Sequence, residues 1–313
     1  MKILFIGYSS LFKRRILPYL DKLPFEEVHI AKYKNQEWDH DYKKYDTKIV
    51  TYDSYEDGFK NAKVDICYIS SINADHFISA VTSLRLGFHT IIDKPATLNI
   101  RELNILFSLA NENNILLAES TVYTYHPQFT EIKKIFEEQK SKIQVINTMF
   151  SFPPLGYDNF RYNRSTGGGA INDTSPYAAS IGRYFFNELP DKVHTIINGT
   201  FNDVETSYSI VMQYPNGQSM IGHFGFTTEY VNDLTLLGEN IKVSISRTYT
   251  IPPSSKTSIK VRSKNAEWVV DVESANVFLL FFEDIIKTIE SSDYIKFTHR
   301  MIMDAKIRNL ILK

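Results

Sequence analysis

Hydrophobic and polar positions change their rhythm about 120 residues into the chain. Before that point, short apolar runs alternate with helical patterns, which is typical of a parallel sheet with crossover helices. Pro18 interrupts the first helical pattern, so a kink or a late helix start is expected there. Apolar residues recur at helical spacing over 75–86, and another helix begins near Asn99. The expected strands are 2–6, 27–31, 47–51, 65–69, 89–92 and 115–119.

From residue 142 onward, long strand-like segments follow one another with few helices between them. Strands in series predict a mostly antiparallel, open sheet within an α+β domain. The expected strands are 142–152, 193–199, 206–214, 218–227 and 242–247, and the expected helices are 169–186, 275–291 and 297–312. The fold class is therefore α/β, with an N-terminal Rossmann domain over 1–120 and a C-terminal α+β domain over 121–313.

Composition excludes several classes of function. The 313 residues carry a formal net charge of -1, which gives no electrostatic reason to expect nucleic acid or a membrane surface as partner. No stretch reaches the roughly 18 apolar residues of a membrane-spanning helix. The single cysteine, Cys67, excludes an intrachain disulfide and indicates a reducing, cytoplasmic location. No cluster has metal-ligand spacing, so no metal is expected.

The turn after the first strand is a candidate nucleotide site. In a Rossmann domain, the pyrophosphate meets the backbone and a helix N-terminus at this point. Only Gly7 of the usual G-x-G-x-x-G signature is present. Ser9 and Ser10 follow, and their small side chains allow close approach while their hydroxyls can bond phosphate oxygens. An ordinary tight turn after a strand explains the segment equally well.

The end of the second strand bears on the type of dinucleotide. An NAD site places an acid here, whereas an NADP site places cationic groups. The chain reads Lys32-Tyr33-Lys34, so either lysine could pair with a 2′-phosphate and the tyrosine could stack on adenine. This pattern favours NADP(H), with NAD(H) still possible. Ordinary surface lysines are the alternative interpretation.

The segment 64–98 carries the first part of a family resemblance. It reads VDICYISSINADHFISAVTSLRLGFHTIIDKPATL. An apolar strand ends in hydroxyl residues, a helix and a second strand follow, and Asp93-Lys94-Pro95 comes next. The other notable residues are Ser70, Ser71, Asn73, His76 and Gly87.

The second part of the resemblance lies downstream. Residues 123–128 read YTYHPQ, residues 160–163 read FRYN, and Gly167-Gly168-Gly169 precedes Asp173 and Tyr177. Over essentially its whole length the chain resembles the glucose-fructose oxidoreductase / inositol dehydrogenase (Gfo/Idh/MocA) family, nearest to its sugar ketoreductases and dihydrodiol dehydrogenases. The family has Glu-Lys-Pro and Thr-Pro where this chain has Asp93-Lys94-Pro95 and Ser71-Ile72. The opening serines with residues 14–18 also resemble a subset that reduces 3-keto groups on nucleotide-linked deoxysugars.

The resemblance implies hydride transfer between NADP(H) and a sugar-like ketone or alcohol. Lys94 and Tyr177 are expected to form a proton-delivering pair, because a nearby ammonium makes a phenol a better proton donor. Asp173, one helical turn before Tyr177, is expected to orient the substrate or to hold Lys94. The expected cofactor contacts are Gly7, Ser9, Ser10, Lys32, Tyr33, Lys34, Ser70, Ser71, Asn73, His76, Asp93 and Lys94. The expected substrate contacts are Arg161, Tyr162 and Asn163.

Three functions stay open at this point. The first is NADPH-dependent reduction of a keto-sugar, nucleotide-linked if the second resemblance holds. The second is NAD(P)-dependent oxidation of a sugar, cyclitol or dihydrodiol, and the third is nucleotide sensing without catalysis. Lys94, Asp173 and Tyr177 favour an enzyme, and Lys32 and Lys34 favour the reductase. A homodimer or homotetramer is also expected, because the apolar face of an open sheet prefers burial.

Overall fold

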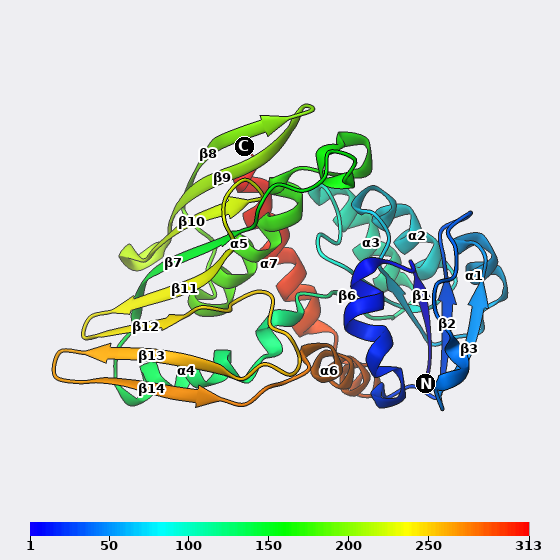
Figure 1. Cartoon of the computed structure of the whole chain (residues 1–313), viewed down its shortest axis with the longest axis horizontal. Coiled ribbons are helices and arrows are strands. Elements are labelled where there is room, and N and C mark those ends of the chain that lie inside the picture. The colour runs from blue at the N-terminus through cyan, green and yellow to red at the C-terminus, as the bar shows by residue number, and fades with distance from the viewer. Residues whose placement is uncertain (313) are drawn as a thin grey trace. The chain divides into compact units, whose positions relative to one another are not determined.

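A six-stranded parallel sheet organises the N-terminal part of the chain (Figure 1). The computed structural model describes residues 1–312. The strands lie in the order β3-β2-β1-β4-β5-β6, and every neighbouring pair is parallel. They are β1 (Lys2–Ile6), β2 (Glu27–Ala31), β3 (Lys48–Tyr52), β4 (Ile66–Ile69), β5 (His89–Ile92) and β6 (Leu117–Glu119). The expected Rossmann arrangement is confirmed, and the order turns back at β1 as it does in doubly wound folds.

Local sequence signals explain the helices around this sheet. They are α1 (Tyr55–Asn61), α2 (His76–Arg85) and α3 (Ile100–Glu112). Asn99 caps α3 by accepting the backbone N–H groups of Arg101 and Glu102. The first helical segment is a π-helix over Phe12–Ile16 followed by a 3-10 helix over Leu17–Lys22, so the expected irregularity at Pro18 is confirmed. The short helix α1 was not predicted.

The chain divides into two units, and the division differs from the expected boundary. The first unit holds Met1–Ser120 together with Phe278–Met301, and the second holds Thr121–Val277 and the residues from Ile302 onward. The returning segment comprises most of α6 (Val277–Ser291) and the start of α7 (Ile295–Ile311). The fully buried Phe282 explains this return, because its ring contacts the rings of Phe5 and Phe25. Residues 278–301, which the expected second domain over 121–313 includes, therefore lie with the first unit in this division.

An eight-stranded sheet forms the second unit. Its order is β14-β13-β12-β11-β7-β10-β9-β8, and only the β7–β10 pair is parallel. The strands are β7 (Ile143–Ser151), β8 (Lys192–Phe201), β9 (Val204–Gln213), β10 (Ser219–Gly225), β11 (Val231–Gly238), β12 (Ile241–Ile245), β13 (Thr257–Ser263) and β14 (Glu267–Val272). The mostly antiparallel sheet is confirmed. The strands β11, β13 and β14 and the helix α4 (Pro127–Glu138) were not predicted.

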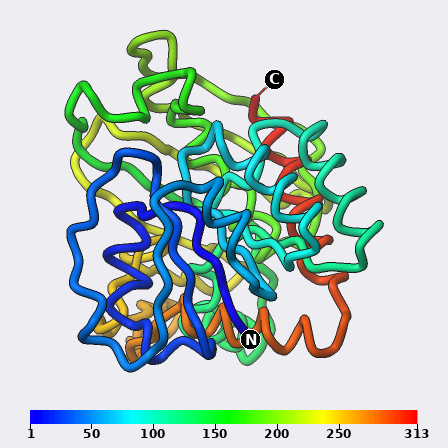
Figure 2. The backbone as a smooth tube through the Cα atoms, turned by 90° about the vertical axis from the view of Figure 1, so that its right-hand side faces the viewer, coloured from blue at the N-terminus to red at the C-terminus, as the bar shows by residue number. Residues whose placement is uncertain are grey.

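The helix α5 (Ala170–Phe186) packs closely on this sheet. A Cβ atom on Gly182 would lie 2.1 Å from the hydroxyl oxygen of Tyr214, so only glycine permits this approach. The end of α7 lies beside α5, where Arg183 donates two hydrogen bonds of 2.7 and 3.0 Å to the Asp304 carboxylate. Figure 2 follows this last helix in red to the C-terminal end. Among residues 1–312, no helix combines the length and the apolar character needed to cross a membrane.

Candidate functional site

A chain of hydroxyl groups around Asp93 runs along the carboxyl edge of the parallel sheet. One carboxylate oxygen of Asp93 accepts hydrogen bonds from the Tyr68 hydroxyl and from Ser120 Oγ, the latter at 2.8 Å. The other oxygen accepts from Ser70 Oγ at 2.6 Å, and Ser70 Oγ is in turn hydrogen bonded to Ser9 Oγ at 2.8 Å. Burial and the charge of Asp93 raise the pKa of Tyr68, which keeps its phenol protonated as a donor. These hydrogen bonds thereby connect the carboxyl ends of β6, β5, β4 and β1.

The turn after β1 is shaped by a glycine and capped by a serine. Gly7 has a φ of 117°, and a Cβ atom there would lie 2.3 Å from the carbonyl oxygen of Ser70. Ser9 Oγ accepts the backbone N–H of Phe12 at 3.1 Å, and Ser10 is exposed. The first strand thus turns tightly beside β4, where a dinucleotide pyrophosphate lies in Rossmann folds. The turn fits that group even though two signature glycines are missing.

Of the three residues after β2, Lys32 is buried in an ion pair, whereas Tyr33 and Lys34 are exposed. The Lys32 ammonium lies 3.1 Å from an Asp53 carboxylate oxygen and 5.4 Å from the centroid of the Trp38 ring. Lys32 is buried, and its expected role as a 2′-phosphate ligand stays a prediction. Tyr33 is 62% exposed and Lys34 is also exposed, so these two remain suited to adenine and to a 2′-phosphate.

His76 joins the loop after β4 to the loop after β5. Its Nδ1 lies 2.8 Å from the carbonyl oxygen of Pro95, and its Nε2 lies 3.2 Å from the carbonyl oxygen of Ser71. The His76 side chain is buried, and so is that of Asn73, three residues earlier in the sequence. Through these contacts His76 holds in place the segment that carries the partly buried Lys94. Because both of its ring nitrogens face backbone carbonyls, His76 is poorly placed to act as a general base.

An ion pair at the start of α5 forms the core of the candidate substrate site. Arg161 Nε donates to an Asp173 carboxylate oxygen at 2.8 Å. Burial lowers the pKa of Arg161, but the adjacent Asp173 and the nearby Tyr177 more than offset this and raise it overall. Tyr177 lies one turn after Asp173, and its ring packs 4.7 Å from that of Tyr249 and 5.8 Å from that of Tyr123. The Arg161–Asp173 pairing was not predicted, although both residues were expected in the site.

The glycine run at 167–169 brings Arg161 to Asp173. A Cβ atom on Gly168 would lie 2.6–2.7 Å from the backbone carbonyl oxygens of Phe160, Arg161 and Asn163. The backbone N–H of Gly169, a residue with φ of 105°, donates to the Arg161 carbonyl oxygen at 2.8 Å. The run is therefore a site of close backbone packing. It folds the 160–163 turn against the start of α5.

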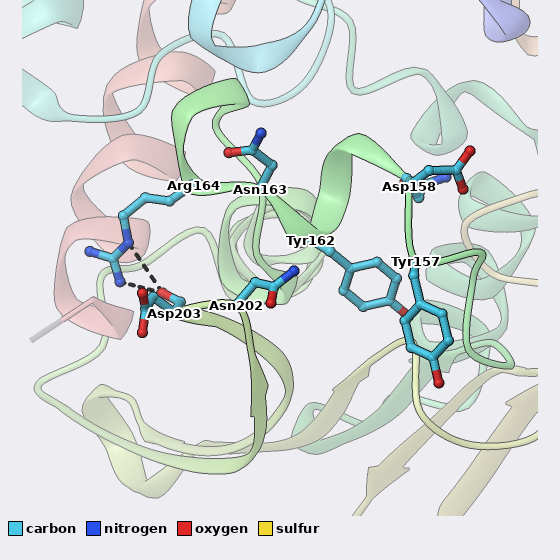
Figure 3. Close-up of a pocket in the computed structure, with 8 residues that line it drawn as sticks. Tyr157, Asp158, Tyr162, Asn163, Arg164, Asn202 and Asp203 are labelled. Carbon is cyan, nitrogen blue, oxygen red and sulfur yellow. Dashed lines mark hydrogen bonds between the residues drawn. The ribbon is translucent and has the colours of Figure 1, made fainter.

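The other two expected substrate contacts line a separate pocket of about 790 Å³ (Figure 3). The Tyr162 hydroxyl accepts the backbone N–H of Leu155 at 3.1 Å, and its buried ring packs against that of Phe201. Asn163 Oδ1 accepts the backbone N–H of Ser165 at 2.9 Å. The lining residues are Tyr157, Asp158, Asn159, Tyr162, Asn163, Arg164, Asn202 and Asp203. Arg161 is not among them.

Two family models match the chain. The model described as "Oxidoreductase family, NAD-binding Rossmann fold" matches residues 1–121. The model described as "GFO/IDH/MocA C-terminal domain" matches residues 129–244. Together the two matches take in most of the chain, although the strands β13 and β14 lie beyond the second match.

Named relatives and a solved structure extend this similarity. The chain is 24% identical over 270 residues to dTDP-3,4-didehydro-2,6-dideoxy-alpha-D-glucose 3-reductase of Actinomadura kijaniata, covering 85% of this chain and 80% of that one. It is 25% identical over 170 residues to trans-1,2-dihydrobenzene-1,2-diol dehydrogenase of Xenopus tropicalis, covering 52% and 50%. The solved structure of KijD10, a 3-ketoreductase from Actinomadura kijaniata in complex with NADP and TDP-benzene, superposes with a TM-score of 0.87 at 20% identity, covering 100% and 97%.

Asp93→Asn is expected to weaken NADPH binding about tenfold, because the new amide NH₂ group cannot accept the hydrogen bond of Ser70 and hydrogen bonds to charged groups contribute about 1.5–3 kcal/mol. Titration of intrinsic tryptophan fluorescence with NADPH measures this change. Asp57→Asn, on the exposed surface of α1, is the matched control. Equal affinity in both variants would show that the hydroxyl chain has no part in shaping the dinucleotide site.

Proposed function

Because the chain belongs to the Gfo/Idh/MocA family of oxidoreductases, we propose that it is an NADP(H)-dependent reductase of a nucleotide-linked keto-sugar. The observation that carries this proposal is the cluster on α5, where Tyr177 follows the Arg161–Asp173 ion pair by one helical turn. Similarity to the dTDP-sugar 3-reductase over 85% of the chain supports the substrate class.

The reaction requires a proton at the carbonyl oxygen of the substrate. A bound nicotinamide supplies the hydride, and the oxygen then carries negative charge that the protein must neutralise. We assign the proton to the phenol of Tyr177, because the nearby Arg161 cation favours the phenolate that remains after donation. We assign Lys94 a second positive charge at the reacting oxygen, since it follows β5 at the edge of the sheet where ligands bind in such folds.

The ion pair adds a second role to those proposed for Asp173. Its carboxylate holds the Arg161 guanidinium at 2.8 Å, so we propose that it also positions Arg161. The expectation that Asp173 orients the substrate or holds Lys94 stays a prediction. Arg161 remains a candidate substrate contact, because its side chain is about one quarter exposed (26%).

Oxidation of a dihydrodiol or a free sugar is the second candidate function. The similarity to the Xenopus tropicalis dihydrodiol dehydrogenase favours it, although that match covers only 52% of this chain. The same residues serve both directions, because a proton donor in reduction is a proton acceptor in oxidation. Turnover of a dTDP-linked 3-keto-deoxysugar with NADPH, compared with that of trans-dihydrobenzenediol with NADP⁺, separates the two.

Tyr177→Phe is expected to lower kcat about 10²- to 10⁴-fold while leaving the Kd for NADPH unchanged, because only the proton donor is removed. Lys94→Ala is expected to lower kcat to a similar extent. Steady-state oxidation of NADPH with a dTDP-linked 3-keto-deoxysugar measures both effects. Tyr230→Phe, at an exposed tyrosine, is the matched control. If both variants keep near wild-type kcat on an accepted substrate, the catalytic assignment is wrong.

The preference for NADP(H) is proposed to depend on Lys34. Lys34→Glu is expected to raise the Kd for NADPH about tenfold with little effect on NADH, because an exposed attraction to the 2′-phosphate becomes a repulsion. Fluorescence titration with each dinucleotide provides the measurement. Lys63→Glu, which makes the same charge change just before β4, is the control. Tighter binding of NADH than of NADPH by the wild-type protein would overturn the preference.

The open face of the eight-stranded sheet is proposed to join copies of this chain. Ile221 is 47% exposed and lies opposite Val211 in register, and Met149 and Ile196 are exposed on the same face. Ile221→Lys is therefore expected to shift the protein toward monomer in sedimentation velocity. Ile295→Lys, at the start of α7, is the control because its side chain is 76% exposed. A wild-type monomer at all accessible concentrations would refute this interface.

A further inference from the structure

Aromatic side chains form one wall of the pocket in Figure 3. The ring of Tyr157 lies 5.4 Å from that of Phe201, and the ring of Tyr162 lies 5.2 Å from the same phenylalanine. Tyr157 is 81% exposed, which is unusual for a large aromatic residue held against other rings. Such a wall buries the apolar face of a ligand ring while the tyrosine hydroxyl stays hydrated.

Asparagine side chains supply hydrogen-bond donors around this wall. Asn159 Oδ1 accepts the backbone N–H of Arg161 at 3.1 Å, and Asn163 Oδ1 accepts that of Ser165 at 2.9 Å. These bonds use the carbonyl end of each amide, which leaves the NH₂ end to donate to a ligand. Asn202, in the hairpin turn between β8 and β9 with φ of 48°, adds a third amide.

Charge disfavours a phosphate in this pocket. Its lining carries one cation, Arg164, and two carboxylates, Asp158 and Asp203, so its formal charge is negative. The Arg164 guanidinium already donates to the backbone carbonyl oxygen of Asp203 at 3.1 and 2.5 Å. A diphosphate would meet net repulsion here, whereas hydroxyl groups donate readily to carboxylates.

We infer that this pocket binds an uncharged, hydroxyl-bearing ring, which is either a saccharide unit or the sugar of a nucleoside. Its volume of about 790 Å³ lies within the usual range of small-molecule sites, roughly 300–1,000 Å³. The combination of an aromatic wall, three amides and two carboxylates suits the apolar faces and polar rim of such a ring. The inference does not depend on the proposed reduction, because no bond is made or broken in this pocket.

The test uses methyl β-D-glucopyranoside, thymidine and thymidine diphosphate as probes of the full chain in saturation-transfer NMR and calorimetry. At least one of the two neutral probes is expected to bind. Tyr157→Ala is expected to weaken that binding at least about fivefold through loss of stacking. Asn202→Gly, which keeps the left-handed turn but removes the amide, is expected to act in the same direction. Asn216→Gly makes the same change in the next hairpin turn and is expected to leave binding unaltered.

The results distinguish the possible ligands from one another. Binding of the glucoside alone identifies a saccharide site, and binding of thymidine alone identifies a nucleoside site. The inference is overturned if neither neutral probe binds, if both pocket substitutions leave binding unchanged, or if thymidine diphosphate alone binds and Arg164→Gln abolishes it. NADPH titration of each variant verifies that the dinucleotide unit is intact. If the wild-type protein binds a neutral probe in this pocket but does not reduce a nucleotide-linked keto-sugar, only the proposed function is contradicted.

Discussion

The carboxyl edge of the parallel sheet depends on the carboxylate of Asp93 and its hydroxyl donors. A half-buried carboxylate requires hydrogen-bond donors, and Tyr68, Ser70 and Ser120 supply three of them. Through Ser70 the network reaches Ser9 in the turn after β1. The shape of that turn and the position of the segment carrying Lys94 are thus fixed by one set of bonds.

The first sheet was predictable because most of its strands are buried on both faces. Such strands read as continuous apolar runs between polar turns. All six strands were found within about two residues of their ends, including the edge strand β3, which is exposed or half-buried throughout. The strands β13 and β14 were missed because exposed charges such as Lys260 and Glu267 break their apolar pattern. The helix α4 was missed although its buried residues recur at helical spacing. The parallel pairing of β7 with β10 depends on the order of the strands in the sheet, and the local sequence of each strand does not determine that order.

The candidate site was only partly predictable for a related reason. The residue types at Asp173, Tyr177 and Arg161 were identified, but the ion pair between Arg161 and Asp173 depends on how the glycine run folds. That run was the available signal, because consecutive glycines permit close backbone contact as well as flexibility. Likewise, Lys32 meets Asp53 because β2 and β3 are parallel neighbours whose ends coincide. The available signal was their position, because Lys32 and Asp53 each directly follow the last residue of neighbouring strands.

The return of 278–301 to the first unit has a consequence for biosynthesis. Phe282 contacts Phe5, Phe25 and Tyr68, which the ribosome makes more than two hundred residues earlier. Until α6 emerges, the nascent N-terminal segment exposes these aromatic rings to water, and it completes its core only near the end of translation. A fragment ending at residue 120 would keep that apolar surface uncovered.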